Sequence, residues 1–154
     1  MSTQIVKYGN PILHEVCEQA DITDANELKK TIALMQNTMI IEQGVGLAAN
    51  QIGINSRIFV WDYQGKTGHI INPQLQISEE RFDTIEGCLS CDRIPVKLSR
   101  AYKCELSGYN HDGEWITVKA DGVLASIFQH EFDHLNGKTI SDTLNRAQRR
   151  KLFK

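Results

Sequence analysis

The residues of this chain best suited to chemistry are two histidines four positions apart with an acid between them. They lie in the segment HEFDH, residues 130–134, within a stretch from about 122 to 135 that predicts a helix. Because residues four apart share one helix face, both imidazoles can bind the same ion. Glu131 lies next to the first of them and can reach a water on that ion, as metal-assisted hydrolysis requires. The alternative is a pair of solvated surface histidines, but the apolar residues around them favour a buried site.

A hydrolytic metal with an open coordination position usually has three protein ligands. The residues after His134 include neither Glu nor a further His, so the downstream ligand of ordinary H-E-x-x-H peptidases is missing. Upstream, Cys88 in the segment EGCLS, residues 86–90, is the best candidate. A divalent ion deprotonates a thiol that binds it, and the resulting thiolate holds the metal firmly.

The chain has four cysteines: Cys17, Cys88, Cys91 and Cys104. Cys88 and Cys91 form a C-x-x-C, a pattern typical of a redox pair or of half a zinc site. Cytosolic thiols stay reduced, so we interpret all but Cys88 as reduced packing residues. A Cys88–Cys91 disulfide would abolish metal binding, and we therefore predict an oxidative inactivation that thiol and added metal reverse.

The segment GVGLAANQ, residues 44–51, has the composition of a backbone that a substrate can approach closely. Its two glycines and two alanines leave space beside the main chain. Gln51 offers an amide that can donate to a developing oxyanion. Taken alone, this pattern is more typical of a simple turn.

The elements that must position these residues are two helices and a strand-rich middle. A first helix is predicted over 24–43, with Asp24 and Glu27 at capping-box spacing and Gly44 as its stop. The second, over 122–135, has Asp121 as cap and Gly137 just past its end. Four stretches between them read as strands: RIFVWDY, GHIINPQLQI, PVKLSRAYKCELSGYN and EWITVKA. This order predicts an α+β fold with helices packed on largely antiparallel sheet.

Length and charge bound the class of protein. The 154 residues predict one domain, 1–154, and the net charge of −2 argues against a protein that coats nucleic acid. No apolar run is long enough to span a bilayer and the start lacks the core of a secretion signal, so we expect a cytoplasmic protein without membrane contact. The tail, residues 145–154, carries five basic side chains and no acid, and predicts a short helix.

Three segments in this order and spacing, GVGLAANQ, EGCLS and QHEFDHLNG, resemble the signature motifs of the peptide deformylases. The resemblance implies antiparallel sheets packed around a central metal-binding helix. It implies a monomeric hydrolase that removes the formyl group from the N-terminal formyl-methionine of nascent chains. Formate and a free amine are the products of this co-translational N-terminal processing.

The resemblance also implies a role for each residue of the site. The metal ligands would be Cys88, His130 and His134, with a water as the fourth. The metal-bound water would attack the formyl carbon, with Glu131 as general acid/base. The side-chain amide of Gln51 and the backbone N–H of Leu89 would form the oxyanion hole.

The ion implied by the resemblance is Fe2+, although Zn2+, Ni2+ or Co2+ can occupy such a site and Cys/His2 ligation suits zinc equally well. The pocket for the methionine side chain would be lined by Gly44, Val45, Gly46, Val123, Ser126 and Ile127. Ser126 stands where larger aliphatic residues are common in the family. We therefore expect a roomier or more polar pocket, unless the hydroxyl simply bonds back to a helix carbonyl.

Some positions depart from the family pattern. Cys91, Asp92 and Arg93 follow EGCLS where an aliphatic residue, Pro and Gly are frequent, and Pro95 stands about where relatives carry a substrate-contacting Arg. Whether Arg93, two residues before Pro95, takes over that contact stays open on the sequence. Asn50 replaces a frequent Pro or Thr.

Two other functions stay open on these residues. One is an H-E-x-x-H endopeptidase, which the missing downstream ligand disfavours. The other is a metal-binding module without activity, which Glu131 and Gln51 disfavour because a structural site needs neither. The tail likewise has two interpretations: a solvated helix end, or a contact with ribosomal RNA through Arg146, Arg149, Arg150, Lys151 and Lys154.

Overall fold

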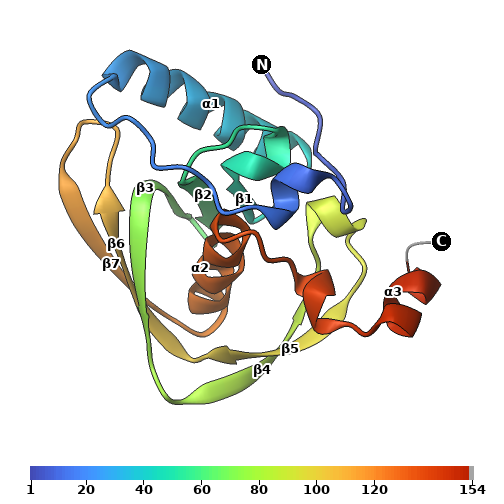
Figure 1. Cartoon of the computed structure of the whole chain (residues 1–154). Helices are drawn as coiled ribbons and strands as arrows, with labels where there is room; N and C mark the ends of the chain where they lie inside the picture. Colours follow the sequence, from blue (N-terminus) through green and yellow to red (C-terminus); the bar gives the residue numbers. More distant parts are fainter. Residues whose placement is uncertain (153–154) are drawn as a thin grey trace.

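The chain folds around one central helix, which Figure 1 shows with strands curving past it. The structure, a computed structural model, describes residues 1–152. The helices are α1 (Ala25–Ile41), α2 (Gly122–Leu135) and α3 (Arg146–Leu152). The strands are β1 (Gly46–Ala48), β2 (Ile58–Tyr63), β3 (Lys66–Ile77), β4 (Arg81–Glu86), β5 (Val96–Ala101), β6 (Lys103–Tyr109) and β7 (Trp115–Asp121).

The strands form two antiparallel sheets. Five strands make the larger sheet in the order β1-β2-β3-β6-β7, and β4 pairs with β5 alone. The register between β3 and β6 shifts between Ile71 and Gln74, where Asn72 has a positive φ of 52°. The predicted α+β class, with antiparallel sheets around the helix that carries His130 and His134, is confirmed.

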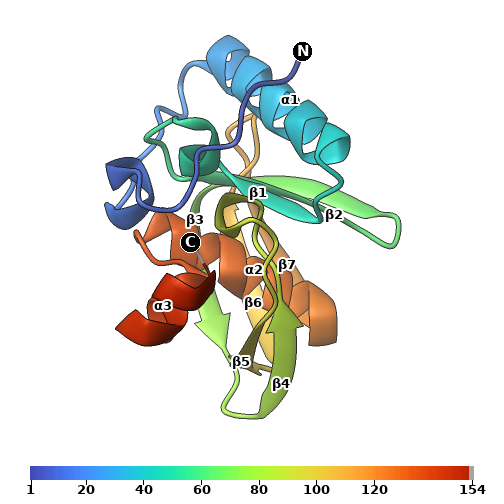
Figure 2. The ribbon, with the colours of Figure 1, turned by 90° about the vertical axis from the view of Figure 1, so that its right-hand side faces the viewer.

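Strand β2 separates the two main parts of the core. Successive strand residues point to opposite faces, and on β2 both faces are buried. Phe59 and Trp61 pack towards α2, whereas Ile58 and Val60 pack towards α1. Figure 2 shows α1 lying along the outer side of β1 and β2, with α2 on their other side.

The predicted first helix is present as α1, with its predicted cap but a different end. Asp24 caps it by accepting a hydrogen bond from the Glu27 N–H at 3.2 Å. The apolar positions that recur at helical spacing are buried: Leu28, Ile32, Met35 and Met39. The predicted stop at Gly44 was wrong, because the helix ends at Ile41 and the residue that turns the chain with a positive φ of 57° is Gln43.

Helix α2 begins and ends where the sequence predicts. Asp121 occupies the cap position, but its side chain makes no cap hydrogen bond. At the other end Gly137 has a φ of 74°, and a side chain there would meet the backbone of Glu15 at 2.8 Å. Glycine is therefore required by both conformation and space.

The predicted strand pattern needs one correction. The stretch 95–110 is two strands: β5 pairs with β4, and β6 joins the large sheet after Tyr102. Strands β1 and β4 were not predicted individually. Strand β4 has no buried residue, so its sequence lacks the apolar alternation of a strand with one buried face.

The predicted tail helix is present as α3. Lys154, which we named as part of its basic face, lies outside the described residues. Among the residues the structure describes, no helix has the length and apolarity to cross a membrane.

Candidate metal centre

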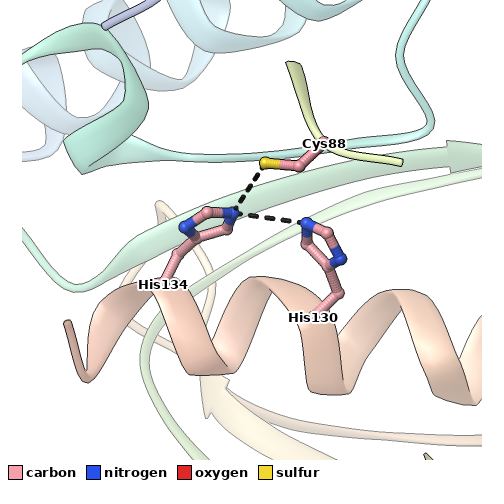
Figure 3. A group of neighbouring side chains, drawn as sticks. All are labelled: Cys88, His130 and His134. Carbon is pink, nitrogen blue, oxygen red and sulfur yellow. Dashed lines mark hydrogen bonds between the residues drawn. The ribbon is translucent and has the colours of Figure 1, made fainter. Parts of the chain in front are cut away.

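Three residues from two separate segments of the chain bring their ligand atoms to one point. Cys88 follows β4 by two residues, and His130 and His134 lie on α2, four residues apart. Figure 3 shows the thiol facing both imidazoles across the gap between these segments. Nε2 of His134 lies 3.3 Å from Sγ of Cys88 and 3.3 Å from Nε2 of His130. All three ligand atoms lie within 4.8 Å of one another.

This donor set fits a divalent metal. One sulfur and two imidazole nitrogens are ligands typical of Zn2+ and Fe2+ sites, and three protein ligands leave one position open. Burial lowers the pKa of His134, which keeps its imidazole in the neutral form that metals bind. Within the described part of the chain, the geometry therefore supports the three ligands that the sequence suggested.

Glu86 orients the first histidine. Its Oε1 lies 2.9 Å from Nδ1 of His130. Burial alone would raise the pKa of Glu86, but hydrogen bonds from Arg100 and His130 lower it to about 2. An ionised carboxylate can only accept, so Nδ1 carries the proton and the lone pair of Nε2 faces the shared point.

Arg100 holds this carboxylate in place and ties it to α2. Its guanidinium donates twice to Glu86, at 2.8 Å each, and once to Asp133 at 2.7 Å. The Arg100 side chain is 11% exposed and that of Glu86 is 10% exposed. Sequence reasoning did not assign a role to Arg100 or Asp133. Their only signal was that Asp133 lies inside the histidine motif.

Glu131 lies against strand β1. A Cβ atom at Gly46 would lie 2.5 Å from Oε2 of Glu131 and 3.0 Å from its Cδ, so a glycine is needed for the carboxyl to fit there. Burial raises the pKa of Glu131 to about 7. Within the described part of the chain, its Oε1 has no hydrogen-bond partner. A buried carboxyl with a free oxygen and a pKa near neutrality is suited to proton transfer.

Gln51 presents its amide nitrogen to the centre. Its Oε1 accepts the Ala48 N–H at 3.0 Å, which fixes the orientation of the carboxamide. Nε2 donates to the Ser90 hydroxyl at 3.1 Å and lies 3.5 Å from Sγ of Cys88. The side chain is buried and can donate to a charged oxygen beside Cys88.

Asn50 has a structural role that the sequence did not indicate. Its Nδ2 donates to the backbone oxygen of His134 at 2.7 Å. The segment that contains Gln51 is thereby joined to the end of α2 that carries a proposed ligand.

A cavity of about 280 Å³ opens beside the three ligands. It is lined by the predicted catalytic residues Gln51, Leu89 and Glu131, by two proposed ligands, Cys88 and His130, and by the six predicted substrate-binding residues: Gly44, Val45, Gly46, Val123, Ser126 and Ile127. His134 is buried behind this surface.

Two further cavity residues stand at positions that depart from the family pattern. The hydroxyl of Ser126 donates to the Val123 carbonyl at 2.6 Å, so it bonds back to its own helix. Arg93 also lines the cavity, and its guanidinium lies 3.5 Å from the Gln43 carbonyl oxygen. Arg93 thus reaches the mouth of the cavity although it is two residues away from Pro95.

The fold and this centre define a metal-dependent hydrolase, and comparisons with known proteins specify the family. Residues 2–150 match the family described as polypeptide deformylase. A peptide deformylase of Acidothermus cellulolyticus is 41% identical over 93% of this chain and 79% of its own length. The structure of a Legionella pneumophila peptide deformylase superposes with a TM-score of 0.93, at 31% identity, over 99% of this chain and 91% of that one. The structure of the Thermotoga maritima peptide deformylase superposes with a TM-score of 0.88, at 39% identity, over 92% of this chain and 97% of that one.

The chain therefore belongs to the peptide deformylase family. The activity implied by the sequence motifs, metal-dependent removal of N-terminal formyl groups, is confirmed at the level of the family.

Proposed function

We propose that this chain deformylates N-formyl-methionyl peptides at the centre formed by Cys88, His130 and His134. The observation that carries the proposal is the convergence of their ligand atoms within 4.8 Å beside the cavity. A divalent ion held by these residues supplies the Lewis acidity that activates water for hydrolysis.

In this proposal, Glu131 moves the proton. Its carboxyl is buried between α2 and Gly46, and its pKa of about 7 lets it accept and return a proton near neutral pH. Glu131 takes the proton of the attacking water and passes it to the leaving amine. The C–N bond breaks, and formate and a free amine leave the site.

We assign the oxyanion hole to Gln51 and Leu89. The oriented Nε2 of Gln51 donates from one side. Leu89 is the first residue of a short 3-10 helix, Leu89–Cys91, whose first N–H groups lack partners within the helix. Donors fixed before the reaction stabilise the developing charge without reorganisation.

We propose that the methionine side chain enters between β1 and the start of α2. Val45 and Val123, each 48% exposed, stand at the cavity and bury apolar surface when a substrate binds. Ser126 adds room where its hydroxyl turns back to the helix. We expect Ser126→Ile to diminish the preference for formyl-Met over formyl-norleucine and formyl-Ala peptides. An undiminished preference for formyl-Met in this variant contradicts the roomier pocket.

We propose Fe2+ as the physiological ion, in line with the family resemblance. The donor set itself accepts Zn2+, Ni2+ or Co2+ as well. Metal analysis of protein purified without oxygen identifies the ion, and zinc alone in such a sample contradicts the proposal.

The decisive test is formate release from formyl-Met-Ala-Ser by the metal-loaded protein. We expect Glu131→Gln to lower kcat by about 10²–10⁴-fold at unchanged metal content, because it removes the proton carrier and keeps the shape. Glu80→Gln, on an exposed turn, is the matched control. Cleavage of an internal peptide bond without formate would instead indicate an endopeptidase.

We further propose a monomer acting in the cytoplasm, with a transient ribosome contact through α3. Arg146 and Arg150 are exposed, whereas Arg149 donates to the Ser141 carbonyl at 3.2 Å and so faces the protein body. The contact therefore has fewer free cations than the sequence suggests. Salt-sensitive cosedimentation with ribosomes that survives deletion after Asn145 contradicts it.

A further inference from the structure

We propose that Cys88 and Cys91 form a reversible disulfide when a peroxide enters the active site, so that Cys91 protects the metal ligand from irreversible oxidation. Cys91, which the hydrolytic reaction does not use, thereby has a chemical role of its own. The local geometry of residues 88–91 supports this role.

The backbone brings the two cysteines to the separation that a disulfide needs. The Cys91 N–H donates to the Cys88 carbonyl at 2.9 Å. Such a bond between residues three apart closes a turn whose end Cα atoms are less than about 7 Å apart. Disulfides join Cα atoms up to about 6.8 Å apart, so a small adjustment of the side chains is sufficient.

The two side chains are close neighbours. The thiols of Cys88 and Cys91 lie near enough to interact, and the Ser141 hydroxyl donates to Sγ of Cys91 at 3.2 Å. Both belong to the small buried cluster that also includes Val96 and Ile140.

The other cysteines are in a different part of the core. Cys17 and Cys104 pack in the cluster around α2 and the large sheet. All four thiols are free in the structure. A disulfide between residues 88 and 91 is therefore the pairing that the fold favours.

Access gives the two thiols different roles. Cys88 lines the cavity, whereas Cys91 is 1% exposed and is not part of the cavity wall. A small oxidant that enters the cavity meets Cys88 first, and Cys91 is the resolving thiol behind it.

The chemistry balances with hydrogen peroxide as the oxidant. The Cys88 sulfur attacks one peroxide oxygen, the O–O bond breaks and, after proton transfer, a sulfenic acid and water result. The Cys91 sulfur then attacks Sγ of Cys88; the S–O bond breaks, the S–S bond forms and a second water carries away the thiol proton. Two thiols are oxidised and one peroxide is reduced.

The disulfide has two consequences. Cys88 can no longer bind a metal as a thiolate, so the ion is released; this consequence rests on the ligand assignment proposed above. The sulfur is also kept from the sulfinic and sulfonic states, which thiols do not reduce. Loss of activity is then reversible by a thiol and added metal.

The test uses the zinc-loaded protein, because zinc is not redox-active and iron oxidation cannot contribute. The protein is treated with hydrogen peroxide, alkylated and digested with trypsin. Cleavage after Arg81 and Arg93 isolates the peptide 82–93, which includes Cys88 and Cys91 but neither Cys17 nor Cys104. Its mass, the zinc released and the activity recovered with dithiothreitol plus zinc are measured.

We expect the wild-type peptide to lose two hydrogen atoms and to escape alkylation, with zinc release in parallel and nearly full recovery. In Cys91→Ser the same peptide gains two or three oxygen atoms, and recovery is lower by about tenfold or more. Cys91→Ala is the second variant, in case the serine destabilises this buried position. Cys104→Ser is the matched control and behaves as wild type.

Two results overturn the proposal: over-oxidation of Cys88 in the wild type without a disulfide, or equal recovery of the wild type and both Cys91 variants. A disulfide that forms without zinc release supports the redox pair and contradicts the assignment of Cys88 as a ligand. The two ideas therefore fail separately.

Discussion

At the scale of single residues, the closest constraint in the site is between Gly46 and Glu131. The proposed proton carrier occupies the space that a side chain at position 46 would fill. Glycine at this position thus serves an acid 85 residues further along the chain, in addition to leaving room for a substrate. The two glycines of the first motif are not equivalent for this reason.

We predict that Gly46→Ala displaces the Glu131 carboxyl and lowers kcat/KM by about 100-fold, since a shift of about 1 Å in a catalytic group has such an effect. The metal content stays that of the wild type, because no proposed ligand is touched. Steady-state formate release and metal analysis measure both quantities.

The matched comparison is Gly44→Ala. A Cβ atom there would approach the flexible end of Leu89 at 3.1 Å and would not touch Glu131. We expect Gly44→Ala to lower kcat/KM less than Gly46→Ala does. Equal losses of kcat/KM would mean that the contact between position 46 and Glu131 is unimportant.

At the scale of elements, Arg100 on β5 connects the segment of the thiol ligand to the helix of the imidazole ligands. It binds Glu86 at the end of β4 and Asp133 on α2. The small sheet, although its strand β4 has no buried residue, is thereby fixed against α2 by charge-assisted hydrogen bonds. These bonds tie the strand that leads to Cys88 to the helix that carries the two histidines.

We predict that Arg100→Met lowers the free energy of unfolding by roughly 3–5 kcal/mol, because the carboxylate of Glu86, on a side chain only 10% exposed, loses its charged partner and keeps only its bonds to His130 and Thr84. Zinc affinity falls by about 10–100-fold, since Glu86 no longer holds the ring of His130. Urea unfolding and competition with a chelator measure the two effects. Arg100→Lys keeps the charge but not the bidentate geometry, and should recover only part of either quantity.

Arg81→Met is the control for this prediction. Arg81 lies on the same hairpin, where it donates to Ser99 at an exposed position. We expect Arg81→Met to change the free energy of unfolding by at most about 1 kcal/mol. A similar loss of zinc affinity in both variants would show that the hairpin, and not the ion pair, orients the ligands.

At the scale of the whole molecule, we propose that residues 1–154 fold as one unit. The apolar clusters meet at β2, which contributes Phe59 and Trp61 to one and Ile58 and Val60 to the other. Unfolding followed by tryptophan fluorescence and by far-UV circular dichroism should therefore give coincident transitions. Two separate transitions would contradict the single unit.

We predict that metal removal destabilises the whole fold. An ion that bridges Cys88 and α2 binds only the folded chain. At a free metal concentration about 1,000 times the dissociation constant, it adds about 4 kcal/mol to the free energy of unfolding. For a chain of this size, the melting temperature should fall by roughly 10 °C in a chelator and return with zinc. The variant His111→Asn, which changes a histidine outside the centre, should keep this difference in melting temperature. The variant His134→Asn should abolish it. A chelator effect that persists in His134→Asn contradicts the ligand assignment.

Local sequence patterns are sufficient to indicate the class of reaction and most of the elements. Residues close in the chain carry their spatial relation with them, because helix geometry places His130 and His134 on one face and Asp24 over the first turn of α1. The motifs therefore indicate a metal-dependent hydrolase, its family and the two main helices.

Contacts between residues far apart in the chain became visible in the folded structure alone. That Arg100 joins Glu86 to Asp133, that Gly46 makes room for Glu131, and that Asn50 binds the end of α2 all depend on contacts between separate elements. The same holds for the two strands within 95–110, whose division between sheets depends on available partners and not on local propensity. Spacing along a chain specifies a helix face, but a contact across the fold follows from how all the elements pack together.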